Sequence, residues 1–149
     1  MSIVRKLSHV GICVSDVERS IAFYRDALGF EQVHDLRVEG EPSDSLLQLR
    51  GVRLHAVFLQ RDGLRIELLH FESPRSPSES GSRPMNDLGF THLSVMVASI
   101  DEALPRLEAA GASIDQDTLI RIGGRTVAGM VRDPDGLRIE LILRDPTAT

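Results

Sequence analysis

The sequence predicts an α+β fold built from two tandem βαβββ modules related by pseudo-two-fold symmetry. The first observation is an internal repeat, because Asp62–Leu68 and Asp135–Leu141 are the same seven residues, Asp-Gly-Leu-Arg-Ile-Glu-Leu. Such identity is unexpected by chance in a chain of 149 residues and indicates duplication. The second observation is that each copy comes last in a similar series of segments, in which strand-like segments with alternating apolar residues accompany one helical segment. We expect module 1 at residues 1–72, a linker at 73–87, module 2 at 88–145 and a tail at 146–149.

Module 1 is predicted to begin with a strand at residues 7–14, where apolar residues recur at every second position. A helix follows at residues 17–28, because Asp16 is a good N-cap and Gly29 is a good residue for its C-terminal end. Turn-rich segments then separate short apolar runs. These runs predict strands at residues 31–38, 45–49, 53–60 and 64–71.

Module 2 repeats this order after a stretch rich in Ser and Pro, residues 73–87, which predicts an extended and exposed linker. Ser99 and Glu102 form a capping box that predicts the start of a helix at residues 100–110. The pair Gly123-Gly124 predicts a hairpin turn. The strands expected in this module are residues 90–97, 113–122, 125–132 and 137–143.

Composition excludes several classes of protein. The formal net charge of −5 argues against nucleic acid as a partner, because that binding relies on clustered Lys and Arg. No apolar run approaches the roughly 20 residues that span a bilayer, and the first residues lack the apolar core of a signal peptide. A single cysteine, Cys13, excludes an internal disulfide and fits a reducing compartment. We therefore expect a cytoplasmic protein that acts on a small molecule, with no nucleic acid and no membrane as partner.

Each module carries one histidine and one glutamate at matching places. His9 and His92 lie in the first predicted strands, and Glu67 and Glu140 lie in the last. Alternation puts each of them on the strand face opposite the apolar residues that pack the helix. If the two sheets meet around the pseudo-two-fold axis, the four side chains converge in a half-barrel cleft. Two imidazoles and two carboxylates are a ligand set for a divalent metal, and burying them without one would be costly.

Other polar and apolar residues favour simpler interpretations. Arg65 and Arg138 share the face of the glutamate two residues later, and surface charge is a better interpretation than anion binding at the cleft. His70 has the opposite parity to Glu67 and is excluded as a ligand. The remaining candidates are Cys13, expected to pack, His34 and His55, expected on the surface or in the core, and Met96, Phe58, Leu69 and Phe71, expected as lining or core.

Several motifs resemble those of the vicinal oxygen chelate superfamily, which includes glyoxalase I, methylmalonyl-CoA epimerase, fosfomycin-resistance transferases, extradiol dioxygenases and bleomycin-resistance proteins. The motifs are residues 7–12, 20–24 with 28–30, 89–93, and 133–136 with 139–141, so that the resemblance covers nearly the whole chain. It implies that His9, Glu67, His92 and Glu140 bind one divalent metal, Ni, Co, Zn or Mn, and that the protein is a homodimer. Whether the modules pair within one chain or between two is left open.

The resemblance implies a metal-dependent lyase or isomerase of the glyoxalase type. In such an enzyme the metal chelates two neighbouring substrate oxygens and stabilises an enediolate, while Glu140 or Glu67 moves the proton as general base. One alternative is an epimerase similar to methylmalonyl-CoA epimerase. Another is a non-catalytic small-molecule binding or resistance protein. An extradiol dioxygenase fits less well, because that chemistry uses two His and one carboxylate.

Three positions depart from these families. Bacterial glyoxalase I carries an Arg and an Asn that hold glutathione, and this chain has Cys13 and Phe71 at those positions. The epimerase family carries a second His where Thr91 stands. The resemblance therefore extends to the fold and the metal, and it does not identify the substrate.

Overall fold

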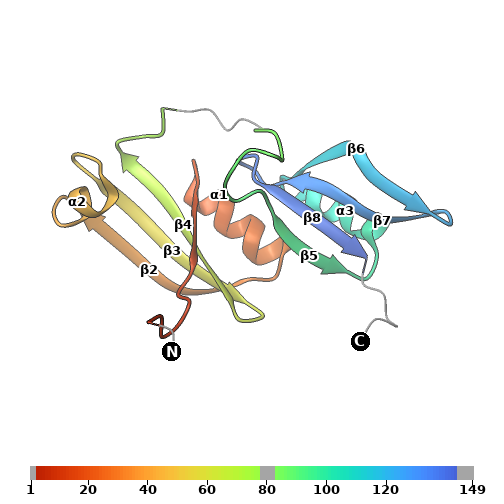
Figure 1. Ribbon diagram of the computed structural model, residues 1–149, viewed down its shortest axis with the longest axis horizontal. Coiled ribbons are helices and arrows are strands. Elements are labelled where there is room, and N and C mark those ends of the chain that lie inside the picture. Colours follow the sequence, from red (N-terminus) through yellow and green to blue (C-terminus); the bar gives the residue numbers. More distant parts are fainter. Residues whose placement is uncertain (1–2, 78–82, 144–149) are drawn as a thin grey trace. The chain divides into compact units, whose positions relative to one another are not determined.

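A computed structural model describes residues 3–77 and 83–143, in two compact units that divide between residues 77 and 78. Each unit contains one four-stranded mixed sheet with helices (Figure 1). The strand orders are β1-β4-β3-β2 in module 1 and β5-β8-β7-β6 in module 2, and in each the first strand pairs in parallel with the last. The predicted α+β fold of two βαβββ modules is therefore confirmed. The expected tail, residues 146–149, lies outside the described residues.

Module 1 contains a helix whose two ends match the sequence prediction. The Asp16 carboxylate accepts a hydrogen bond from the backbone N–H of Arg19 at 3.0 Å, and Gly29 follows the helical segment with a positive φ of 71°. The helix packs on β4 and contributes buried apolar side chains to the core. The elements are β1 (Val10–Cys13), α1 (Val17–Ala22), the π-helical segment η1 (Phe23–Ala27), β2 (Glu31–Glu39), α2 (Ser43–Leu47), β3 (Arg53–Arg61) and β4 (Leu64–Ser73).

One predicted strand of module 1 is wrong. Residues 45–49 do not form a strand, because the short helix α2 occupies Ser43–Leu47 and Gln48 then adopts a left-handed conformation. The Asp44 carboxylate accepts the backbone N–H groups of Gly51 and Val52, each at 2.8 Å, and so holds the helix against the start of β3. Because β2 pairs directly with β3, the sheet has no position for a strand between them.

Module 2 has the predicted elements with small changes at their ends. The Ser99 hydroxyl accepts the backbone N–H of Glu102 at 3.2 Å, as expected for a capping box. Gly123 and Gly124 both have positive φ, as the hairpin turn requires. Figure 1 shows α3 behind the sheet strands of this module. The elements are β5 (Leu93–Val97), α3 (Ile100–Ala109), β6 (Ser113–Ile122), β7 (Arg125–Arg132) and β8 (Arg138–Leu143).

The first strand of each module is shorter than predicted. β1 starts at Val10 and β5 starts at Leu93, because their pairing with the last strands begins there, at Ile66 and Ile139. His9 and His92 therefore lie one residue before the strands. Each histidine is adjacent to the paired region but is not part of it.

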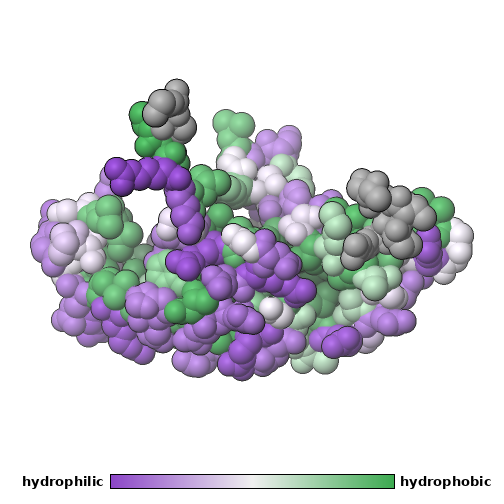
Figure 2. Space-filling view, turned by 90° about the horizontal axis from the view of Figure 1, so that it is seen from below, coloured by the Kyte–Doolittle hydropathy of each residue, from purple (hydrophilic) through white to green (hydrophobic). Residues whose placement is uncertain are grey.

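Buried apolar side chains form the core of each module, and the surface is mixed. Figure 2 shows hydrophobic residues in separate groups among hydrophilic ones on the face that it presents. No helix within residues 3–77 and 83–143 is long and apolar enough to cross a membrane. Of the predicted linker, residues 78–82 lie outside the described residues. Arg83, at its C-terminal part, is joined to module 2 by a hydrogen bond to the carbonyl of Leu88 at 2.9 Å.

Candidate metal site

In module 1 the predicted histidine and glutamate are in contact. His9 Nε2 lies 2.9 Å from Glu67 Oε2, and the Glu67 side chain is only 16% exposed. The edge of the His9 ring meets the ring of Phe58, with centroids 5.2 Å apart. Gly11 is the β1 residue in register with Glu67, so no side chain of β1 stands beside the carboxylate. Strand register thus places the carboxylate, and an aromatic contact supports the imidazole.

Module 2 contains the equivalent pair with one more partner. His92 Nε2 lies 3.5 Å from Glu140 Oε2. Ser94 is in register with Glu140, and its hydroxyl donates to the same Oε2 at 2.8 Å. The carboxylate of this module therefore has a hydrogen-bond donor on the neighbouring strand, whereas its counterpart in module 1 faces a glycine.

A hydroxyl group contacts the far side of each imidazole. Ser8 Oγ lies 2.8 Å from His9 Nδ1, and Thr91 Oγ1 lies 2.8 Å from His92 Nδ1. These two contacts were not predicted from the sequence. A signal was present, because both histidines are preceded by a residue with a hydroxyl group.

The donor atoms of each pair are spaced for one metal ion. Bonds of roughly 2.0–2.2 Å at tetrahedral or octahedral angles put two ligand atoms about 3.0–3.5 Å apart. The separations of 2.9 Å in module 1 and 3.5 Å in module 2 agree with this spacing. An imidazole nitrogen and a carboxylate oxygen also match the ligands that Zn, Ni, Co and Mn accept. The residues present therefore fit a divalent ion.

Each module alone contributes one half of the predicted ligand set. Within the described parts of the chain, no group of three or more His, Cys, Asp or Glu side chains is arranged to hold a metal ion. The pairs His9–Glu67 and His92–Glu140 are what the structure brings together. That all four bind one ion stays a prediction.

The other histidines have different surroundings. His70 Nδ1 lies 3.3 Å from the carbonyl oxygen of Val14, and alternation along β4 turns it away from Glu67. His55 is buried and its Nε2 lies 3.0 Å from Asp35 Oδ1. His34, on β2, is exposed and its ring lies beside that of Phe58. None of these contacts involves the two His–Glu pairs.

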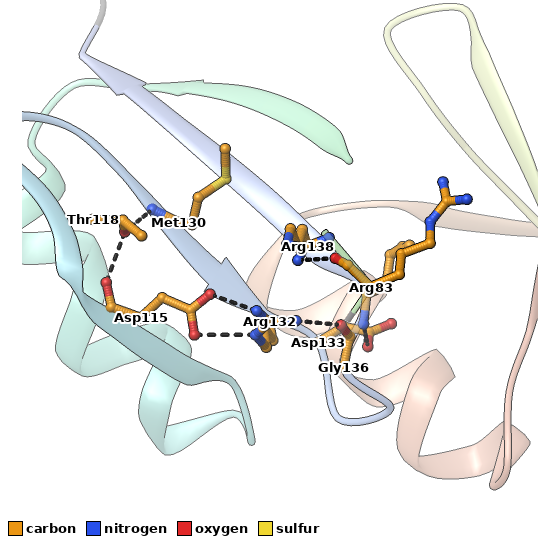
Figure 3. Close-up of polar contacts among 9 residues, drawn as sticks. Arg83, Asp115, Thr118, Met130, Arg132, Asp133, Gly136 and Arg138 are labelled. Carbon is orange, nitrogen blue, oxygen red and sulfur yellow. Dashed lines mark hydrogen bonds and ion pairs between the residues drawn. The ribbon is translucent and has the colours of Figure 1, made fainter. Parts of the chain in front are cut away.

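The two arginines of the repeat have different roles. Arg65 is exposed, and its side chain has no hydrogen bond or ion pair within the described residues. Arg138 is partly buried and donates to the carbonyl oxygen of Arg83, as Figure 3 shows. Beside it in the sheet, Arg132 pairs with Asp115 through two contacts of 3.0 Å. Surface charge thus describes the first arginine but not the second, which holds the segment before β5 against β8.

The predicted lining residues divide between the core and the surface. Leu69 and Phe71 pack against the buried cluster of Val52, Leu54 and Ala56. Phe58 is partly buried against the His9 ring. Cys13 and Met96 are exposed, so neither of them belongs to the core.

The chain is similar to a known protein family and to several individual proteins. A profile described as "Glyoxalase/Bleomycin resistance protein/Dioxygenase superfamily" matches residues 6–141. The chain is 30% identical to the uncharacterized protein YwkD of Bacillus subtilis, with coverage of 93% of this chain and 97% of that one. It is 28% identical to the lactoylglutathione lyase of Salmonella typhimurium, over 92% and 91% of the two chains. It is 27% identical to a probable chloroplastic lactoylglutathione lyase of Arabidopsis thaliana over 96% of this chain, but it spans only 37% of that protein.

Solved structures with the same fold include a glyoxalase family protein of Bacillus cereus, with a TM-score of 0.79, 23% identity and coverage of 95% of both chains. The trypanothione-dependent glyoxalase I of Leishmania major gives a TM-score of 0.65 at 25% identity, over 94% and 87% of the two chains. A mutant of the fosfomycin resistance protein FosX of Listeria monocytogenes, complexed with Mn(II), gives a TM-score of 0.60 at 18% identity, over 97% and 96%.

Proposed function

The chain belongs to the Glyoxalase/Bleomycin resistance protein/Dioxygenase superfamily, and from this premise we propose that it is a divalent-metal-dependent lyase or isomerase of the glyoxalase type. The observation that carries the proposal is the recurrence of one arrangement in both modules. In each, an imidazole Nε2 faces a carboxylate Oε2 at 2.9 or 3.5 Å, and a hydroxyl contacts the far nitrogen of the ring. A chance contact between two surface residues in one module would not be expected to recur at the matching positions of the other module.

The ion would be held by four residues, His9, Glu67, His92 and Glu140. The two modules that supply them would come from one chain or from the two chains of a homodimer. The two carboxylates would balance the charge of a dication. When bound, Ni, Co, Zn or Mn would supply Lewis acidity toward two neighbouring substrate oxygens and so stabilise an enediolate. The relatives support a metal in this fold, since FosX is described in complex with Mn(II).

The side chains of the protein perform the proton transfer. A glutamate carboxylate, from Glu140 or Glu67, accepts the proton from the substrate carbon beside the two oxygens. The protonated carboxyl group then delivers a proton to the neighbouring carbon, while the hydroxyl proton passes from one substrate oxygen to the other, so that the substrate is converted to its isomer without a net change in protons. The imidazoles of His9 and His92 remain as fixed ligands, because they carry no acid–base task in this sequence of steps.

The substrate is proposed to be a small molecule with adjacent oxygens, and the glutathione part of the family substrate is not assumed. Phe71, which stands where glutathione-dependent relatives carry a polar residue, packs against the buried cluster of Val52, Leu54 and Ala56. Cys13 is a small residue at the other position. Neither side chain supplies the charge or the amide that holds a peptide carboxylate.

The experiment that tests the function combines metal analysis with isotope exchange. The purified protein is expected to contain about one divalent ion per site, and to catalyse exchange of a substrate C–H in D2O with a panel of thiohemiacetals of different thiols. Exchange with acyl-CoA thioesters alone would favour the epimerase. A protein that binds no metal, and shows no exchange after metal is added, would contradict the proposal and favour a non-catalytic binding protein.

A further inference from the structure

Each candidate metal-binding histidine has its second ring nitrogen in contact with a hydroxyl group from the residue before it. The distance is 2.8 Å both for Ser8 Oγ to His9 Nδ1 and for Thr91 Oγ1 to His92 Nδ1. The two residues differ, but their hydroxyl groups occupy the same place on the ring. Since the contact recurs in both modules, it is tied to the histidine rather than to one local turn.

The contact determines which nitrogen faces the carboxylate. With Nδ1 held by the hydroxyl, Nε2 of His9 points at Glu67 Oε2 and Nε2 of His92 points at Glu140 Oε2. A flip of the ring by half a turn about χ2 would break the hydroxyl contact and turn a carbon atom toward the carboxylate. The hydroxyl thus selects one of two ring orientations of similar shape.

A hydroxyl suits this task because it can both donate and accept a hydrogen bond. When imidazole Nε2–H donates to the carboxylate, Nδ1 carries a lone pair and accepts from the hydroxyl. When Nε2 gives its lone pair to a metal, the ring proton lies on Nδ1, which then donates to the hydroxyl oxygen. A carboxylate or a backbone carbonyl in the same place could serve only the second arrangement.

We infer that Ser8 and Thr91 are positioning residues that keep Nε2 of His9 and of His92 directed at the metal, through a hydrogen bond that reverses its direction when the metal binds. The inference rests on the proposed function, since it requires a metal. Ser8 and Thr91 would touch neither the ion nor the substrate. Their hydroxyl groups would set the orientation of the two imidazole rings.

The first test is Zn²⁺ binding by the full chain, measured by calorimetry. Ser8→Ala and Thr91→Ala are each expected to weaken Zn²⁺ binding by about tenfold or more, which is the usual effect of removing the partner of a metal-bound histidine. Ser8→Thr and Thr91→Ser keep the hydroxyl and are expected to bind as wild type does. Ser45→Ala is the matched control, because it removes a hydrogen bond of 3.0 Å that a serine on α2 donates to the Glu41 carboxylate.

The second test follows the ring protons by ¹⁵N NMR of histidine-labelled protein. Adding Zn²⁺ to the wild type is expected to move the proton of both rings from Nε2 to Nδ1. In Ser8→Ala and Thr91→Ala a share of the Zn²⁺-bound rings is expected to coordinate through the other nitrogen and keep the proton on Nε2, which the loss of a merely structural hydroxyl would not cause. Alanine variants that bind Zn²⁺ as tightly as the wild type, or Zn²⁺-bound rings of the wild type that keep the proton on Nε2, would overturn the inference while the metal site stands. A wild type that binds no metal would overturn the proposed function, and the inference with it.

Discussion

The two modules contain the same seven residues but form different turns with them. In module 1, Asp62 and Gly63 make a two-residue hairpin with φ of 49° and 81°, between the paired residues Arg61 and Leu64. In module 2 the turn is longer, because the Asp133 carboxylate accepts the backbone N–H groups of Asp135 at 2.9 Å and Leu137 at 2.8 Å. Identical residues therefore do not force identical turns, since the preceding residues decide how the chain enters the last strand.

Strand register compensates for this difference. Glu67 is opposite Phe58 of β3, and Glu140 is opposite Met130 of β7. Each glutamate also lies beside the first strand of its module, opposite Gly11 and Ser94. Sheet pairing, rather than the turn, therefore brings each carboxylate to its histidine. The main remaining difference between the pairs is the hydroxyl of Ser94, which module 1 lacks.

The largest effect should follow the loss of either carboxylate. Glu140→Gln and Glu67→Gln each remove a proposed proton acceptor and ligand, and C–H exchange in D2O should fall by about 10²–10⁴-fold. Proton NMR of the substrate measures the rate. Glu72→Gln is the control, because Glu72 is another β4 glutamate, in an exposed ion pair with Arg37. If one variant retains the wild-type exchange rate, the glutamate of that module is not required for the reaction, and the two modules differ in their catalytic role.

Removing a matched core side chain should be the next largest effect. Leu68 and Leu141 are the last residues of the two repeats, and both are fully buried. Leu68→Ala and Leu141→Ala should each lower the free energy of unfolding by about 2–5 kcal/mol, through lost apolar burial and an incompletely filled cavity. Urea unfolding followed by circular dichroism measures it, with the exposed Leu46→Ala as control. A loss far smaller in one module than in the other would show that the two cores are not equivalent.

The Ser94 hydroxyl can be exchanged between the modules. Ser94→Gly gives module 2 the environment of module 1 and should weaken Zn²⁺ binding by about tenfold, because Glu140 loses a hydrogen bond that orients it. Gly11→Ser in the same background should recover part of that loss. The added Cβ would lie 3.2 Å from Leu69 Cδ1, at the end of a side chain that can shift. Calorimetric titration measures the Zn²⁺ affinity. If Ser94→Gly binds Zn²⁺ as tightly as the wild type, the Ser94 hydroxyl does not distinguish the two modules in metal binding.

The smallest effect should be a pH-dependent contribution from Asp101, at the start of α3 in module 2. The hydroxyl of Thr126 donates to the Asp101 carboxylate at 2.5 Å and its backbone N–H donates at 3.0 Å, and these hydrogen bonds hold the pKa of Asp101 below its ordinary value. A lowered folded-state pKa stabilises the fold above the unfolded pKa of about 3.9, and this stabilisation is lost as the pH falls through the lowered pKa.

Asp101→Asn should therefore lower the urea midpoint at pH 7, and the difference from wild type should shrink in acid. Glu18→Gln tests the matching position in α1, which is the second residue of that helix, as Asp101 is of α3. A midpoint difference for Asp101→Asn that does not change with pH would contradict the assignment.

Much of the fold could be predicted because its signals are local. The caps at Asp16 and Ser99 and the Gly123-Gly124 turn depend on residues a few positions apart, and all three formed as expected. Residues 45–49 did not, because a short apolar run is compatible with either a strand or a helical turn. The deciding interactions there join Asp44 to Gly51 and Val52, seven and eight residues away.

The duplication, the βαβββ order of each half, and the presence of one imidazole and one carboxylate in each half can all be predicted from the sequence. Periodicity and identity are properties of the amino-acid chain alone, and they do not depend on how distant residues pack. Only the tertiary structure decided that Ser8, Thr91 and Ser94 contact three of those four groups, and that Arg138 holds Arg83 while Arg65 faces solvent. Such contacts depend on strand register and side-chain rotamers, which identical residues do not share when their neighbours in space differ.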